Sequence, residues 1–366
     1  MATPSAPGDV PDPEALADTF HVYEIEETDD GVRYYGEPLT VRDEVVQRLA
    51  PRFREAGYRV TMNYETGEFV LVATERSLSV DGIPWTNALL FVATVLTTLF
   101  AGTRWYGLRI ESPLAALGTW PFALSVLGVL AVHELGHYVM SRRHEVQATL
   151  PYFIPIPNVL GTLGAVIRMK DTIPDREALF DIGVAGPLAG LGATVVVTVV
   201  GLALPPIEVG ESALVARIDL GFPLLLQGIA ALLGEPLRYG DPGVIPNPVL
   251  IGGWVGAFVT FLNLLPVGQL DGAHVARAAV GDRLGVVQTA VPIALFGLAG
   301  CLFLFADGRG AFLWVVWGVL TVVFGRVGNV TPTDDSPVGR PRQAVAVFTL
   351  AAGLLCFTPV PIAFAG

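Results

Sequence analysis

Lysine is almost missing from this sequence, in which Lys170 is the single lysine among 366 residues. Charged residues of all kinds make up only 15% of the chain, whereas 52% of its residues are hydrophobic. Together with a mean hydropathy of +0.57, these proportions favour a polytopic membrane protein over a set of soluble domains. The formal net charge of −12 gives no reason to expect a nucleic-acid partner.

Cysteine is also scarce. Cys301 and Cys356 both lie in apolar stretches without the spacing of a secreted disulfide framework, so we expect them to be packing residues. Residues 1–19 lack the basic start and the apolar run of a signal peptide. We predict that these residues form a disordered tail.

Acidic residues are concentrated near the N-terminus. Residues 1–84 contain 17 of the 34 Asp and Glu but only seven of the 22 basic residues, which indicates an acidic soluble region ahead of a membrane body. An acidic surface that carries arginine in place of lysine would suit a protein from concentrated salt. A genome rich in G and C explains the same composition, so both interpretations stay open.

The soluble region has the pattern of two strands, a helix and two strands. Alternating apolar residues predict four strands, at 21–27, 32–36, 58–64 and 68–74. A helix is expected between Thr40 and Gly57. We therefore predict a small acidic ββαββ domain over residues 20–76, a linker over 77–84, and a membrane domain over 85–366.

Long apolar runs follow, and a membrane-spanning helix needs about 20 such residues. We predict seven spans, at 85–102, 120–140, 179–204, 249–265, 286–305, 312–324 and 345–364. The apolar stretch 220–233 is too short to cross and suits a re-entrant or interfacial segment. The expected fold class is an all-α polytopic membrane protein with a small α+β N-terminal soluble domain and a short membrane-associated strand or hairpin.

The positions of arginine predict the orientation, because cytoplasmic loops near helix ends are enriched in it. One side of the membrane collects the arginines that follow spans two, four and six, namely Arg142, Arg143, Arg277, Arg283, Arg326, Arg340 and Arg342. Arg104 and Arg109 lie in a loop on the other side. We therefore expect the first side, which also holds the N-terminal domain, to be cytoplasmic.

The second predicted span ends in the residues LAVHELGHYVMSRR. Because His133 and His137 are four residues apart, a helix places both imidazoles on one face, where they can bind one tetrahedral metal ion. Glu134 lies beside the first histidine, where its carboxylate can take a proton from water on the metal. Alternatively, these are polar helix-end residues near the lipid headgroups. However, ionisable groups inside a span cost about 2.5–3.5 kcal/mol each, and a metal ion offsets that cost.

A catalytic zinc ion needs a third protein ligand. The fourth predicted span ends in VTFLNLLPVGQLDGAHVARA, on the same side of the membrane as the end of the second span, which makes Asp271 a candidate ligand. As alternatives, Asp271 could cap the helix that follows it, and His274, one turn further on, could bind the metal instead.

The two motifs together resemble those of the site-2 proteases, a family of intramembrane zinc metalloproteases. HELGH at 133–137 and NLLPVGQLDG at 263–272 match the family patterns H-E-x-x-H and N-x-x-P-x-x-x-L-D-G. The resemblance covers most of residues 130–285. It is greatest to the plant chloroplast members associated with gravitropism defects and to their archaeal and bacterial relatives.

This resemblance implies a role for each matching residue. His133, His137 and Asp271 would bind one Zn²⁺ per chain, Glu134 would be the general base, and Asn263 would lie near the scissile carbonyl. The implied activity is hydrolysis of peptide bonds within or near the transmembrane helices of substrate proteins, in the lipid bilayer. A catalytically inactive scaffold or a transporter of protease ancestry is the alternative, and the oligomeric state is open.

Some features depart from the wider family. No PDZ-like insertion separates the two motifs. We expect no regulation through a PDZ-like insertion or through a pair of nucleotide-binding domains. The acidic N-terminus differs from a chloroplast transit peptide, which would be poor in acids. We expect a multi-pass protein of a prokaryotic cell membrane with its active site toward the cytoplasm, and a halophilic archaeon is one source that fits the composition.

Two glycine-containing segments complete the predictions. Residues 161–169, GTLGAVIRM, are too short and too rich in glycine for a span, so we predict a strand or hairpin beside the site. Such a strand could pair with a substrate and hold it extended, which makes Gly161 and Gly164 candidate substrate-binding residues. Residues 183–190, GVAGPLAG, would let the third span approach its neighbours closely, and we expect a packing motif without a catalytic part.

Overall fold

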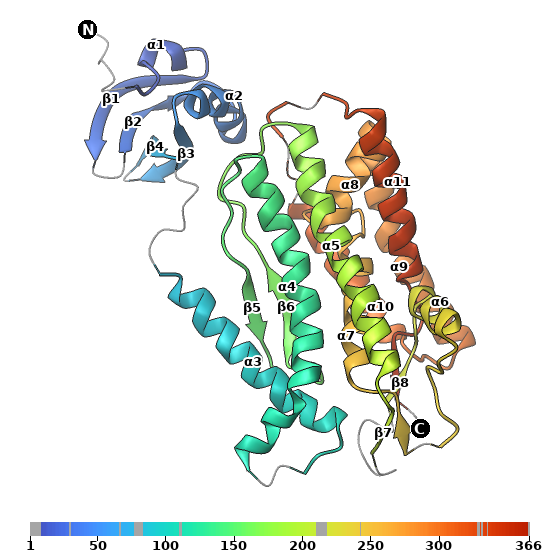
Figure 1. Cartoon of the computed structure of the whole chain (residues 1–366). Helices are drawn as coiled ribbons and strands as arrows, with labels where there is room; N and C mark the ends of the chain where they lie inside the picture. Colours follow the sequence, from blue (N-terminus) through green and yellow to red (C-terminus); the bar gives the residue numbers. More distant parts are fainter. Residues whose placement is uncertain are drawn as a thin grey trace.

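The computed structural model describes a chain with an N-terminal α+β unit and a larger helical body (Figure 1). The described residues are 9–28, 31–65, 67–76, 83–109, 112–209, 218–241, 243–327, 330, 332–334 and 336–364. The first eight residues of the predicted tail and residues 77–82 of the predicted linker lie outside them.

The N-terminal unit, residues 9–76, has the predicted order of two strands, a helix and two strands. Its elements are α1 (Pro13–Leu16), β1 (Phe20–Thr28), β2 (Gly31–Pro38), α2 (Arg42–Glu55), β3 (Tyr58–Glu65) and β4 (Glu68–Glu75). The strands form one antiparallel sheet in the order β1-β2-β4-β3. Alternate strand residues such as Tyr34 and Leu71 pack against Leu49 and Phe53 of α2, which gives the unit a core of its own.

The predicted disorder of residues 1–19 is wrong for the described residues 9–19. Val10 and Leu16 are buried in the same core as Phe20, and α1 forms between them. The hydroxyl of Tyr34 donates a hydrogen bond of 2.9 Å to the carbonyl of Pro11. Two apolar side chains and one backbone acceptor therefore anchor a segment whose composition alone indicated a tail.

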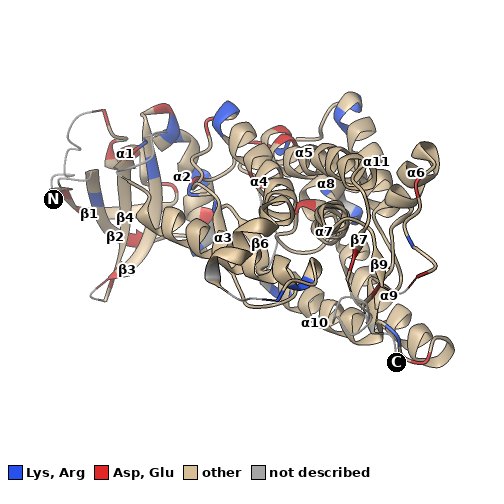
Figure 2. Ribbon diagram, turned by 60° about the horizontal axis from the view of Figure 1, so that its bottom comes forward, with Lys and Arg blue, Asp and Glu red and all other residues tan. Residues whose placement is uncertain are grey.

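The helical body begins with α3. Its helices are α3 (Trp85–Trp105), η1 (Pro113–Thr119), α4 (Trp120–Arg143), α5 (Arg176–Ala203), α6 (Leu224–Leu233), α7 (Val249–Asn263), α8 (Asp271–Val280), η3 (Gly281–Arg283), α9 (Leu284–Phe305), α10 (Ala311–Val327) and α11 (Arg340–Leu355). Long helices run alternately up and down in Figure 1. Figure 2 shows them mostly free of charge, with acidic and basic residues gathered at helix ends and on the N-terminal unit.

Four helical segments of the described chain are long and apolar enough to cross a membrane: Trp85–Trp105, Leu114–Arg143, Arg176–Ala203 and Leu284–Phe305. The chain is therefore a mostly helical protein with membrane-protein character. The other three predicted spans correspond to shorter helices, since α7 has 15 residues, α10 has 17 and α11 has 16.

The prediction of a helix over 345–364 is wrong at its C-terminal end. Helix α11 stops at Leu355, and β10 (Ile362–Phe364) pairs with β8 (Ile218–Leu220). Pro359 and Pro361 explain the difference, because proline lacks the amide hydrogen of a helix and disfavours a helical residue before it. A second short pair joins β7 (Ile207–Glu208) to β9 (Val244–Ile245). The stretch 220–233 contains the ten-residue α6, in agreement with a segment too short to cross.

Helices α4, α5 and α7 pack together at the centre of the body. Small residues bring their backbones close: a Cβ atom at Gly256 of α7 would lie 2.2 Å from the Thr194 hydroxyl of α5. One at Gly252 would lie 2.6 Å from the backbone of Ser125 in α4. In lipid the hydrophobic effect does not drive helices together, so their association depends on close van der Waals packing, which small residues allow. These three helices form the rigid frame that carries the candidate site.

The predicted strand within 161–169 is present as part of a hairpin. β5 (Tyr152–Pro155) pairs antiparallel with β6 (Thr162–Val166), and the hairpin lies beside α3 and α4 (Figure 1). Gly161, at the start of this return strand, has a φ of +82°. A Cβ there would lie 2.4 Å from the Cα of Thr98, so glycine lets the hairpin approach α3 closely.

The N-terminal unit contacts the segments that follow α4 and precede α5. Arg54 donates to the carbonyl of Thr172, and Arg76 donates to the carbonyl of Glu145. The guanidinium of Arg59 donates to the side-chain oxygen of Gln147 at 3.2 Å. The N-terminal unit therefore lies at the same end of the body as the C-terminus of α4.

Candidate metal centre

Helix α4 supplies two histidines from its second half. His133 and His137 are one turn apart and buried, with exposed fractions of 2% and 5%. The Nδ1–H of His137 donates a hydrogen bond of 2.8 Å to the carbonyl of Ile182 in α5. This bond fixes the tautomer in which Nε2 keeps its lone pair, as metal-binding histidines require.

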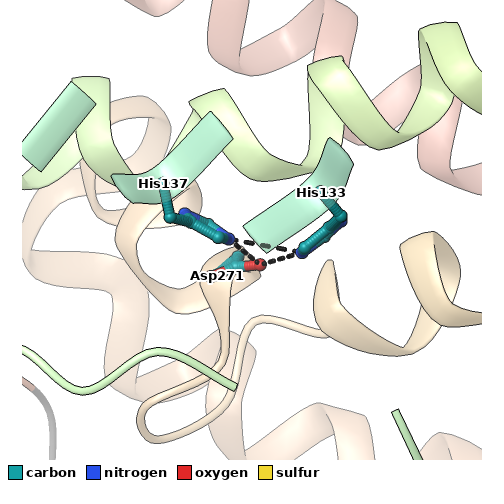
Figure 3. A group of neighbouring side chains, drawn as sticks. All are labelled: His133, His137 and Asp271. Atoms are coloured by element: carbon teal, nitrogen blue, oxygen red, sulfur yellow. Dashed lines mark hydrogen bonds and ion pairs between the residues drawn. The ribbon is translucent and has the colours of Figure 1, made fainter. Parts of the chain in front are cut away.

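Asp271 reaches the histidines from the first turn of α8. A turn between α7 and α8 reverses the chain, with Gly268 at a φ of +58°, where only glycine is unstrained. The Oδ2 atom of Asp271 lies 3.3 Å from Nε2 of His133 and 3.1 Å from Nε2 of His137 (Figure 3). The N-cap of α8 is Leu270, so the carboxylate of Asp271 faces the histidines and does not cap the helix.

These three donor atoms fit a zinc ion. The two Nε2 atoms are 3.2 Å apart, so all three separations fall between 3.1 and 3.3 Å. Ligand atoms in a tetrahedron at about 2.0–2.1 Å from zinc are separated by about 3.3 Å. Two imidazole nitrogens and one carboxylate oxygen also form a donor set that catalytic zinc uses, with the fourth position left for water. His133, His137 and Asp271 are accordingly the group within the described residues that could hold a metal ion.

Glu134 and Asn263 lie at the edges of this group. The side-chain amide of Asn263, the last residue of α7, lies 3.1 Å from Nε2 of His133. Glu134 is buried, with 7% exposed, and its carboxylate lies close to the backbone of Ile167. The structure thus brings together all five residues that the sequence motifs single out.

A cavity of about 710 Å³ opens beside the metal-binding group. Glu134, His137, Asn263 and Asp271 are among the residues that line it. Residues 165–169, from the end of β6 onward, also line it, as does Gln47 of α2. The cavity is large enough for an extended stretch of peptide, since ligand pockets measure about 300–1,000 Å³.

The structure does not place Gly161 and Gly164 among the described residues that line this cavity. Gly161 packs on α3, and a Cβ added at Gly164 would meet no atom within 4 Å. The residues of this segment that do line the cavity are Ala165 to Met169. The strand was recognisable from the sequence, but which of its residues reach the site depends on how α3 and α4 hold it.

Three glycines of α5 each face one histidine: Gly183 faces His274, Gly186 faces His137 and Gly190 faces His133. A Cβ atom at Gly186 would lie 2.0 Å from Nε2 of His137, and one at Gly190 would lie 2.8 Å from Nδ1 of His133. The motif at 183–190 therefore allows close packing, as expected, and two of its glycines pack against the two histidines of α4. The sequence did contain a signal for this contact. Gly186 and Gly190 are four residues apart, as are the two histidines opposite them, so each pair lies on one helix face.

His274 is not part of the metal-binding group, so the structure gives no support for its alternative role as a ligand. Its ring lies in the cavity wall one turn after Asp271. Burial lowers the pKa of His274 to about 4, so the imidazole stays neutral near pH 7.

The fold and the site together define a helical membrane protein with a buried centre of two histidines and one aspartate. The sequence model of Peptidase family M50 matches residues 121–305, just over half of the chain. The chain therefore belongs to this family. The matched region contains both motifs and every donor atom of the centre.

Plant proteins are among the relatives. The chain is 30% identical over 368 residues to the probable zinc metalloprotease EGY2, chloroplastic, of Arabidopsis thaliana, covering 95% of this chain and 64% of that protein. It is 34% identical over 245 residues to Arabidopsis EGY1, covering 66% of this chain and 43% of that protein. It is 27% identical over 372 residues to Arabidopsis EGY3, covering 93% and 62%. The chain thus spans less than two thirds of the length of these relatives. No solved structure matches the chain.

Proposed function

We propose that the chain is an intramembrane zinc protease that hydrolyses peptide bonds within or next to the transmembrane helices of substrate proteins. The observation that carries this proposal is the meeting of His133, His137 and Asp271 at zinc-like separations, with Glu134 on the wall of the adjoining cavity. An inactive scaffold would be expected to lack a ligand or the base, and all four residues are present.

His133, His137 and Asp271 would hold one Zn²⁺ per chain. The ion would polarise the scissile carbonyl and lower the pKa of a water molecule to about 7. Glu134 takes a proton from that water while the hydroxyl oxygen bonds to the carbonyl carbon. Glu134 then gives the proton to the leaving nitrogen as the C–N bond breaks, so that the carboxylate is restored.

Asn263 is proposed to stabilise the carbonyl oxygen during this attack. Its side-chain amide lies 3.1 Å from Nε2 of His133, beside the proposed metal position, so its N–H donors are within reach of an oxygen held there. Hydrogen-bond donors fixed in a buried site stabilise the negative charge on such an oxygen without having to reorganise. A donor of this kind contributes about 100- to 1,000-fold to kcat.

The backbone at residues 165–169 is proposed to hold the substrate. These residues run along the cavity wall, and β6 pairs with β5 on one side only within the described chain. A substrate segment added to the other edge would be extended, which exposes its peptide carbonyl to the site. We expect substrates with Gly, Pro or Asn near the cleavage point to react faster, since these residues favour unwinding. Equal rates for a polyleucine helix and a glycine-containing one would contradict this expectation.

We also propose a seven-span arrangement in a prokaryotic cell membrane, with residues 20–76 as a separate soluble domain on the cytoplasmic side. Helices α7, α10 and α11 are short, but they continue the alternation of direction (Figure 1), and α7 lies among other helices. The clustering of arginines at the ends of α4 and α10 and at the start of α11 supports the orientation. The acidic, lysine-poor composition supports a halophilic source, which a gain in stability in molar salt would test.

Replacing Glu134 with Gln tests the proposed chemistry. Purified E134Q should bind one zinc ion per chain, because the three ligands are untouched, and should lose cleavage of a glycine-containing transmembrane substrate. The exposed Glu235, at the end of α6, provides the control variant E235Q, which should cleave at the wild-type rate. Cleavage by E134Q at the wild-type rate, or wild-type protein that binds no zinc, would contradict the proposal.

A further inference from the structure

His274 lies in the wall of the active-site cavity without an assigned role. It follows Asp271 by three residues in α8, so a helical turn directs both side chains to the same face. Both residues line the cavity together with Glu134 and Asn263. His274 is therefore placed where a substrate would bind.

The Nε2 atom of His274 is buried and has no hydrogen-bond partner in the described part of the chain. Buried side-chain nitrogens are nearly always paired, because leaving water without a new partner is unfavourable. Unpaired groups of this kind are therefore rare, and a catalytic role is one of the explanations for them. A neutral imidazole carries one N–H donor and one acceptor, so Nε2 can donate a single hydrogen bond without adding charge.

The fold accommodates His274 in the same way as the two metal-binding histidines. A Cβ atom at Gly183 would lie 2.7 Å from Cβ of His274 and 3.3 Å from its Nδ1, so the ring fits only because position 183 lacks a side chain. The Nδ1 side of the ring faces α5, which leaves Nε2 at the far end of the ring. One helix thus holds all three imidazoles in a row, through Gly183, Gly186 and Gly190.

We propose that His274 is a further catalytic residue whose Nε2–H donates a hydrogen bond to the scissile carbonyl oxygen as that oxygen gains negative charge. This inference rests on the proposed proteolytic function. It gives the oxygen two donors from different helices, Asn263 at the end of α7 and His274 in α8. Donors that are held in place by packed helices stabilise this charge without having to reorganise.

The test compares two substitutions in the purified full-length protein. H274F keeps a ring of similar shape against Gly183 but has no donor, whereas H274Q keeps an N–H donor. We expect H274F to lower kcat about 100-fold and H274Q to lower it about tenfold or less, with KM within about threefold in both. The affinity for a phosphinic peptide, whose tetrahedral phosphorus mimics the attacked carbon, should fall about 100-fold in H274F. Zinc content should stay at one per chain.

Three results would overturn the assignment. H274F could retain the wild-type kcat and phosphinic-peptide affinity, it could lose zinc, or it could raise KM at constant kcat, which would indicate a contact to the unreacted substrate only. Failure of the underlying function gives a different result, since wild-type protein would then not cleave, or E134Q would. If wild type cleaves, E134Q does not and H274F is fully active, the role of His274 alone is wrong.

Discussion

At the scale of single residues, the candidate metal centre depends on two glycines, whose lack of a side chain leaves room for the histidine rings. Gly186 and Gly190 leave room on α5 for the rings of His137 and His133, and even one methyl group would overlap them. Interiors as closely packed as proteins cannot absorb an atom placed 2.0 Å from another without moving one of the partners. Here the moving partner would be a metal ligand.

Replacing Gly186 with Ala should therefore weaken zinc binding. The new methyl group pushes the His137 ring away from His133 and Asp271, and we expect metal affinity to fall at least about tenfold, as for other changes that disturb ligand orientation. Competition with a chromophoric chelator measures the affinity. Gly192, on the same helix, is exposed and faces open space, so G192A is a matched control that should bind zinc normally. Equal affinities for both variants would show that α5 does not position the ligand.

At the scale of secondary-structure elements, one ionic cluster joins three helices. Arg342 of α11 donates two hydrogen bonds to Asp181 of α5, at 2.8 and 2.9 Å, and a third ion pair at 2.9 Å reaches Glu177. His144, which follows α4, lies 3.0 Å from the same aspartate. The cluster holds α11 against the N-terminal part of α5, the helix whose glycines face the histidine rings.

Replacing Arg342 with Met should destabilise the body by about 1–2 kcal/mol. The estimate lies between the values for exposed and buried ion pairs, because the Arg342 side chain is 32% exposed and that of Asp181 is 21% exposed. Thermal unfolding of the zinc-loaded protein in detergent measures the change as a lower Tm. Arg340, exposed in the first turn of the same helix, gives the control R340M, which should unfold like wild type. An unchanged Tm in R342M would remove the cluster as a source of stability.

Elements were predictable from sequence where one local signal dominates. The length of the apolar runs and the arginines beside them predicted the positions of α3, α4, α5 and α9. The alternation of apolar and polar residues predicted the strands of the N-terminal unit. The prediction was wrong where two weak signals compete. Apolar residues near the C-terminus indicated a helix, but Pro359 and Pro361 end it and leave a strand to pair with β8.

The candidate site shows the same division between local and tertiary information. The four-residue spacing predicted that His133 and His137 share one helix face. The second motif, and its expected place on the same side of the membrane, predicted that Asp271 joins them, although it lies 134 residues from His137 in sequence. Gly186, Ile167 and the orphaned nitrogen of His274 became visible only once α5, the hairpin and α8 were in place. These residues act through contacts between elements, and no periodicity within one element encodes such contacts.

At the scale of the whole molecule, three arginines attach the N-terminal unit beside the cavity. Arg54, Arg59 and Arg76 all donate to the segments on either side of the hairpin, at Thr172, Gln147 and Glu145 respectively. Arg76 also lies 3.5 Å from Asp171, which lines the cavity. The docking surface is thus polar, and its strength should depend on these few contacts.

Replacing all three arginines with Ala should release the unit from the body. We expect backbone amides around residues 171–173 to exchange hydrogen faster, because they lose the cover of the docked unit. Hydrogen exchange followed by mass spectrometry measures this directly. Arg48 lies on the same helix as Arg54 but pairs with Glu44 within the unit, so R48A should exchange like wild type. Identical protection in the triple variant would mean that other contacts hold the unit in place.

The long sequence separation between His137 and Asp271 also has a consequence for synthesis. At about 5–20 residues per second, roughly 7 to 27 s pass between the translation of the two residues. During this interval a ribosome-bound chain carries two histidines without their aspartate, although the first helices have already entered the membrane. The centre of two histidines and one aspartate is completed only after α8 has been made, so until then a nascent chain lacks a residue that the proposed cleavage requires.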